Sequence, residues 1–195
     1  YYAKQDAEKL SGKGDTSQKL TLMKTSADSL KKSADALNDS SLWEKKKIKK
    51  KDEKTGEEIA VEDYDWDKIT KAVKSFVEDY NDVVKEAGES NTKDVLRNAS
   101  WMTGMTDKNS NMLAKIGITI GKGNKLELDE DALKQADISS LKTMFTGYNS
   151  FVSKISQKAT GISNAANRAS ATYTNNGTYS KTDSYLTSSK IDKEV

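Results

Sequence analysis

Hydrophobic residues recur at alternating steps of three and four positions along three stretches of the chain, which is the spacing of a heptad seam. The first stretch predicts a helix over about 16–41, the second a helix from about 66 to 88, and the third one uninterrupted helix over 141–173. At about 1.5 Å per residue, the third helix would be roughly 50 Å long. Helices of this kind bury narrow stripes against one another or against helices of other chains, so the pattern predicts an elongated, coiled-coil-like bundle.

The residues of these seams are expected to be structural packing positions with no direct role in recognition. Polar residues and glycine mark the helix ends: Asp15, Thr16 or Ser17 can cap the first helix, Asp65 can cap the second, and Gly88 can end it. The seam positions are Leu20, Met23, Leu30, Leu37, Trp66, Ile69, Val73, Phe76, Tyr80, Phe145, Tyr148, Val152, Ile155 and Ile162.

Two shorter segments carry the signals of β-hairpins. In 43–63, a run of six lysines around Ile48 is followed by a turn sequence ending at Gly56 and then by a run of glutamates. We interpret this segment as a Lys-rich strand that pairs with a Glu-rich strand, in preference to a phosphate-binding patch. In 115–129, isoleucines and leucines alternate on either side of a Gly-Lys-Gly-Asn turn, and Asp129 then caps a short helix.

In chain order, these elements divide the sequence into three parts. A weakly ordered start covers 1–15, a helical leg-like domain covers 16–173, and a mobile polar tail covers 174–195. A shorter helix is expected at about 91–104. The expected fold class is therefore mainly α, with the two small β-hairpins as a minor component.

The composition supports an elongated protein over a deep globular core. Hydrophobic residues make up 34% of the 195 residues and charged residues 32%. The net charge of +2 gives no general attraction to nucleic acid or to an acidic membrane surface. No apolar stretch approaches the ~20 residues of a membrane helix, so membrane insertion is not expected.

The residue types needed for common catalytic and metal sites are missing. The chain has no His and no Cys, which excludes imidazole and thiolate chemistry and disulfide bonds. The acidic run after Glu62 resembles the start of a calcium loop, but Lys68 and Lys74 stand where that loop needs Gly and Glu. We therefore expect no catalytic residue, no cofactor and no metal, and no enzymatic activity.

Two stretches resemble a known family. The first is Ile69–Ala87, which contains the phrase FVEDYND within a heptad helix. The second is Leu113–Gly147, in which Ile-Gly-Ile-Thr, a hairpin turn, LELDEDAL and Phe-Thr-Gly follow in order. Together, over about 64–150, they resemble the C-terminal part of bacterial flagellar filament-capping proteins, the second hook-associated protein.

The resemblance implies a non-enzymatic, extracellular protein of the bacterial flagellum. Its implied partners are flagellin or other flagellar axial proteins, and the full-length form is implied to be a homo-oligomer. The family's large β-rich head domains have no counterpart, and the hairpin at 43–63 stands where such a domain would be inserted. The chain starts at Tyr1 and not at Met, so we expect a processed chain or a fragment. A truncated chain and a reduced paralogue both fit.

A second hypothesis comes from a different functional class. A secreted helical adhesin, or an effector-type binding protein, would share the amphipathic helices and the lack of catalytic motifs. The location of the gene separates the two: flagellar neighbours favour the assembly protein, and an isolated secretion cassette favours the adhesin.

Overall fold

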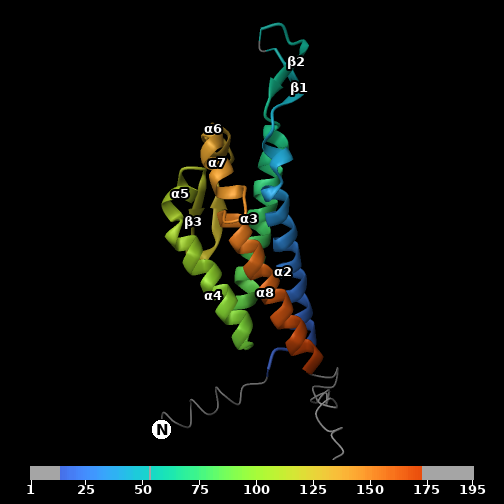
Figure 1. The fold of residues 1–195 in the computed structure, drawn as a ribbon, viewed down its shortest axis with the longest axis vertical. Coiled ribbons are helices and arrows are strands. Elements are labelled where there is room, and N and C mark those ends of the chain that lie inside the picture. The colour runs from blue at the N-terminus through green and yellow to red at the C-terminus, as the bar shows by residue number, and fades with distance from the viewer. Residues whose placement is uncertain (1–13, 53, 173–195) are drawn as a thin grey trace, which may run out of the picture.

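The body of the protein is a bundle of long amphipathic helices (Figure 1). The computed structural model describes residues 14–52 and 54–172. Helix α2 lies beside α3 and α8, and α4 also packs against α3 and α8. The hydrophobic stripes of the four helices therefore face a common axis. The long helices are α2 (Ser17–Asn38), α3 (Trp66–Gly88), α4 (Lys93–Lys108) and α8 (Phe151–Thr172).

Polar contacts at heptad spacing set the register between α2 and α8. Ser163 donates to Asp28 at 2.6 Å, and Ser156 donates to Asp35 at 2.7 Å. The aspartate with the higher residue number on α2 therefore bonds to the serine with the lower residue number on α8, so the two helices are antiparallel. Each aspartate also pairs with a lysine four residues earlier on α2. These bonds flank the hydrophobic seam and fix which residues of the two helices face each other.

The C-terminal end of α2 is anchored by a buried tryptophan. A 3-10 turn, η1 (Ser40–Trp43), follows the helix. The indole N–H of Trp43 donates to the carbonyl oxygen of Leu37 at 2.8 Å. The ring stacks on Phe145 with centroids 5.6 Å apart. The side chain of Trp43 thus joins the end of α2 to Phe145, which lies far along the chain.

A two-stranded antiparallel hairpin projects from the bundle beyond η1 (Figure 1). It consists of β1 (Lys46–Lys51) and β2 (Glu58–Asp63), with Lys46 opposite Asp63 and Lys51 opposite Glu58. The turn holds Gly56 at φ 73°, a left-handed conformation that glycine adopts without strain. The predicted hairpin is confirmed. We call this hairpin, residues 46–63, the arm.

The second predicted hairpin is also confirmed and lies on the side of the bundle formed by α3 and α4. Gly117 enters it at φ 79°, and a Cβ there would lie 2.7 Å from the carbonyl oxygen of Asp129, so only glycine fits. The side chain of Asp129 accepts from two backbone N–H groups of α6, the predicted cap. In order, this region contains α5 (Ser110–Ala114), β3 (Ile118–Ile120), η2 (Lys122–Asn124), β4 (Leu126–Leu128), α6 (Glu130–Gln135) and α7 (Ile138–Phe145).

The prediction of one unbroken helix over 141–173 was wrong. Helix α7 ends at Phe145, and α8 begins only at Phe151. Between them Gly147 adopts φ 98°, which a right-handed helix cannot contain. Tyr148, predicted to lie in the seam, is 89% exposed in this connection. Ser150 then accepts from the backbone N–H of Ser153 at 3.2 Å and so caps the new helix.

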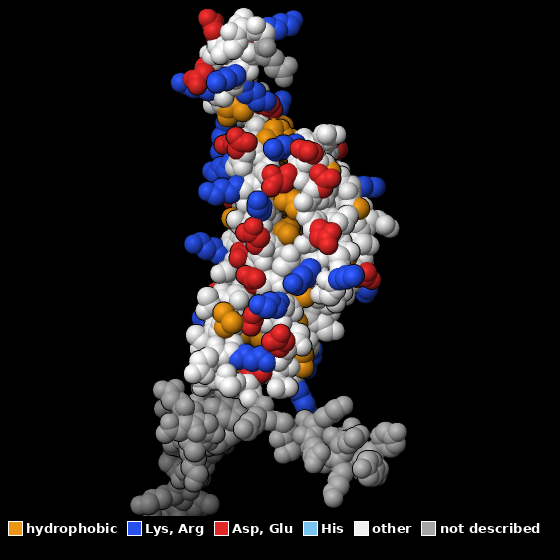
Figure 2. Space-filling model, turned by 180° about the vertical axis from the view of Figure 1, so that it is seen from behind, with side chains coloured by type: hydrophobic (Ala, Val, Ile, Leu, Met, Phe, Trp, Pro, Cys, Tyr) orange, Lys and Arg blue, Asp and Glu red, His pale blue; other side chains and the backbone are white. Residues whose placement is uncertain are grey.

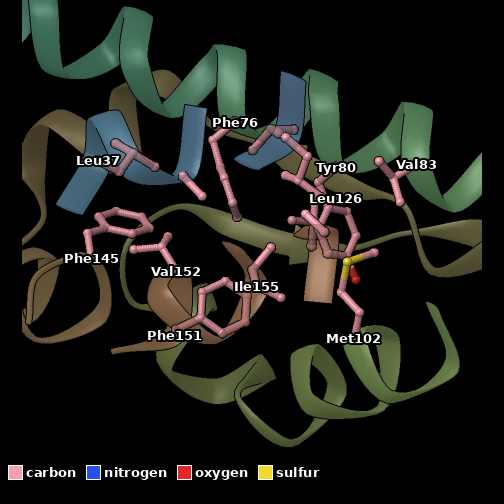
Figure 3. Packing of buried hydrophobic residues seen from close by; sticks show 14 of the residues in the cluster. Leu37, Phe76, Tyr80, Val83, Met102, Leu126, Phe145, Phe151, Val152 and Ile155 are labelled. Carbon is pink, nitrogen blue, oxygen red and sulfur yellow. The ribbon is translucent and has the colours of Figure 1, made fainter. Parts of the chain in front are cut away.

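The other seam residues lie in or against one continuous core. Trp66 is partly buried and packs on that core, and the remaining seam residues named above are buried. Phe76 points from α3 toward the rings of Phe145 and Phe151, with centroids 6.5 and 6.3 Å away (Figure 3). The predicted tail, and the predicted start apart from its last two residues, fall outside the described residues. Asp15, placed in the weakly ordered start, is instead buried.

Candidate protein-interaction surfaces

The FVEDYND segment of α3 combines the packing predicted for its seam residues with hydrogen bonds that the sequence did not reveal. Phe76 supplies the aromatic centre of the core. The hydroxyl of Tyr80 donates to Thr106 of α4 at 2.9 Å, and Thr106 in turn donates to the carbonyl oxygen of Met102. Burial raises the pKa of Tyr80 to about 12, even though the bond to Thr106 opposes the shift. This chain of bonds fixes α4 against α3.

Asn81, the next residue of that segment, holds the second hairpin to the bundle. Its side-chain amide donates to the carbonyl oxygen of Leu126 at 2.8 Å and accepts from the N–H of the same residue at 2.7 Å. The amide thereby forms the two bonds that a neighbouring strand would form with β4. The hydrophobic pattern alone could not distinguish Asn81 from the other polar residues on α3.

Asp15 ties the start of α2 to the loop between α3 and α4. Its side chain is fully buried. The carboxylate accepts from the hydroxyls of Ser90 and Thr92, each at 2.7 Å, and from the backbone N–H groups of Asn91 and Thr92. Burial alone would raise the pKa of Asp15, but these bonds outweigh it and lower the pKa. Asp15 thus fixes the residues that lead into α4, where the hydroxyl of the N-cap residue Thr92 bonds to Asp15 and makes no capping bond to the helix.

The arm is the most prominent surface feature without a role in the core. Because side chains alternate across a strand, Ile48, Ile59 and Val61 share one face of the hairpin. Ile59 is 41% exposed, and none of the arm residues that the structure describes, 46–52 and 54–63, belongs to the buried cluster. Basic and acidic side chains lie close together on the arm, and hydrophobic ones form only small spots on this side of the molecule (Figure 2).

The charges of the arm are partly paired between its strands. The ammonium nitrogen of Lys49 lies 3.3 Å from a carboxylate oxygen of Glu58, and that of Lys50 lies 2.5 Å from a carboxylate oxygen of Asp63. The bond from Lys50, together with the backbone N–H of Tyr64, lowers the pKa of Asp63. This is the cross-strand pairing predicted from the lysine and glutamate runs. Each of these pairs is largely exposed, so each contributes at most about 1 kcal/mol to stability.

A shallow groove of about 530 Å³ runs along the outer side of α2 and α3. Burial raises the pKa of Asp79 at one end of the groove, despite a hydrogen bond with Ser33, and the nearby acids Asp82 and Glu78 raise it further. The groove is lined by Ser29, Lys32, Ser33, Ala36, Lys68, Lys71, Ala72, Ser75 and Asp79. The small and basic side chains, with Asp79 as the acid among them, leave a shallow space between the two helices.

Across residues 14–52 and 54–172, acidic side chains do not gather into a group that could hold a metal ion. In the same part of the chain, no helix combines the length and the apolar character needed to cross a membrane.

Comparison with known families identifies the class of protein. Residues 90–194, more than half of the chain, match the family described as flagellar hook-associated protein 2 C-terminus. The chain is thus an assembly protein of the bacterial flagellum. It belongs to the flagellar hook-associated protein 2 family, in the C-terminal region of that family. No curated protein and no solved structure matches the chain.

The match confirms the resemblance inferred from the sequence and moves its boundaries. The resemblance was placed over about 64–150, whereas the match begins at residue 90 and extends to residue 194. Helices α4 to α8 and most of the expected polar tail therefore belong to the matched region. The arm, α2 and α3 lie before it, so the family match assigns no role to the arm.

Proposed function

We propose that this protein acts outside the cell as a cap-like assembly protein of the flagellum. In this role it binds flagellin or another axial protein and associates with further copies of itself. It catalyses no covalent reaction. Membership of the hook-associated protein 2 family supports the proposal.

The observation that carries the binding part of the proposal is the projecting arm. The core of the bundle is complete without it, yet the arm holds three aliphatic side chains and two strands of opposite charge away from the body. A surface of this kind is stabilised when a partner covers it. The lysines of β1 face a strand of acids, and we therefore expect no binding of nucleic acid in a gel-shift assay at physiological salt.

The test of this function is deletion of the gene, followed by electron microscopy of the cells and measurement of flagellin in the medium. Loss of a cap-like protein should leave hooks without filaments and release unpolymerised flagellin. Expression of the protein from a plasmid should restore the filaments. Normal filaments in the deletion strain, with no labelling of flagella by a specific antibody, would instead favour the secreted adhesin.

A further inference from the structure

We propose that the arms of neighbouring copies join edge to edge, with β1 of one copy pairing antiparallel to β2 of the next. The partner that binds the free strand edge of the arm is thus a second copy of this chain. This inference rests on the self-association in the proposed function and specifies the surface that carries it.

The arm has two strand edges available for pairing. Within residues 14–52 and 54–172, its sheet contains β1 and β2 alone, so among these residues each strand has a neighbour on one side only. Each strand is six residues long and turns a row of backbone N–H and C=O groups outward along its free edge. An isolated two-stranded hairpin is marginally stable in water, and further strands stabilise it.

The charges of the two strands select which edges can meet. Five of the six residues of β1 are lysines, and three of the six residues of β2 are acids. Two β1 edges would bring lysines together, and two β2 edges would bring acids together, which is destabilising. Pairing of β1 with β2 of another copy places opposite charges across the new contact. It repeats the arrangement within one arm, where Lys49 pairs with Glu58.

The aliphatic face of the arm supports the same arrangement. Ile48, Ile59 and Val61 lie on one face, where Ile59 is 41% exposed. An added strand of the next copy would place a further Ile48 beside Ile59 and Val61. The three aliphatic side chains of each arm would then form a continuous stripe across the joined sheet, and each would lose exposure to water.

The width of the bundle limits how such copies can be arranged. Strands in a sheet lie about 4.8 Å apart, so joined arms would repeat about every 10 Å. A helix with its side chains is about 10–12 Å wide, and α2 packs against two further long helices, α3 and α8. The bundles are therefore wider than the arms. Neighbouring copies must fan out around a common axis, with the arms nearest to that axis.

Disulfide cross-linking tests which edges meet. The chain has no Cys, so Lys49→Cys on β1 and Ala60→Cys on β2 each introduce a single thiol at an exposed site. If β1 of one copy pairs with β2 of the next, disulfide-linked dimers should form when the two variants are mixed and oxidised. Either variant oxidised alone should give only a low, non-specific yield of dimer. Equal dimer yields in all three samples, or no dimer in the mixture, would overturn the proposal.

Charge exchange provides the second test. Changing Lys47, Lys49 and Lys51 to Glu, and Glu58 and Glu62 to Lys, preserves opposite charges within the arm. Such a variant should associate with itself but at least tenfold less with the unchanged protein in a tagged pull-down. A variant that binds the unchanged protein as well as itself would exclude charge-selected pairing of the arms.

The matched control exchanges an exposed ion pair on the body, Lys74→Glu with Glu130→Lys, and should leave association unchanged. The outcome is separable from that of the proposed function. If both arm tests fail while gene deletion still removes the filaments, the arm inference is wrong and the flagellar function stands.

Discussion

Asp15 shows how one side chain can join distant segments. Its carboxylate accepts from four donors in residues 90–92 and is fully buried. Asp15→Ala removes the acceptor that these donors share, so we expect a loss of about 2–3 kcal/mol in the free energy of unfolding, measured by urea denaturation. Asp52→Ala, which removes an exposed cap in the arm turn, is the control and should have a smaller effect. Equal effects would contradict the role given to Asp15.

The pH dependence of stability should reflect the same carboxylate. Hydrogen bonds lower the pKa of Asp15 in the folded protein, so its contribution is fully present above the unfolded pKa, near 3.8. The contribution is lost as the pH falls further, through the folded pKa. Asp15→Asn should therefore be less stable than the unchanged protein at pH 7, and the difference should shrink below about pH 4. Denaturation curves from pH 2.5 to 7 measure this, and a difference independent of pH would contradict it.

Asn81 allows a comparable test on the second hairpin. The side-chain amide of Asn81 bonds to both the N–H and the carbonyl oxygen of Leu126. Asn81→Ala should therefore lower the free energy of unfolding by about 2 kcal/mol. Amide hydrogen exchange should show faster exchange in β3 and β4 than in α2. Asp82→Ala changes the neighbouring exposed residue of the same helix and should leave both stability and exchange nearly unchanged. If both variants behaved alike, the clamp would not support the hairpin.

At the level of helices and strands, local signals predicted most elements and long-range contacts decided the rest. The arm was predictable because its turn residues and its two charge runs are adjacent in sequence. The break between α7 and α8 was missed because Leu141, Phe145, Tyr148 and Val152 keep the heptad spacing through it. Gly147 was the local signal against a continuous helix. The hydrogen bonds that Asp15 accepts from residues 90–92 could not be predicted, since these partners lie at least 75 residues away.

Two glycines test the assignment of this break. A Cβ at Gly147 or at Gly104 would meet no atom within 4 Å, but only Gly147 has a positive φ, of 98°. Gly147→Ala should therefore destabilise the protein by about 1–2 kcal/mol. Gly104→Ala, within α4, should stabilise it by about 0.5–1 kcal/mol, because alanine favours a helix. Thermal melts of the two variants should shift in opposite directions. A stabilising Gly147→Ala would support the continuous helix.

For the molecule as a whole, the structure separates a body that carries the core from an arm that does not. Trp43 and Phe145 close the core at the base of the arm, where their rings stack. Beyond that point, the described residues of the arm contribute no side chain to the buried cluster. By contrast, Ile118 and Leu126 of the second hairpin are 0% and 2% exposed. The two hairpins predicted from similar sequence signals therefore differ in role: one completes the body, and the other is available to partners.

Replacement of the arm, residues 46–63, by a short Gly-Ser linker tests this separation. Lys46 and Asp63 are paired across the sheet, so a linker of about four residues can close the gap. The free energy of unfolding should change by less than about 1 kcal/mol, because the buried core remains intact. Self-association, followed by sedimentation at increasing concentration, should be lost. A matched replacement of β3 and β4 should unfold the body. If the variant without the arm still self-associates, the contact between copies lies on the helical bundle.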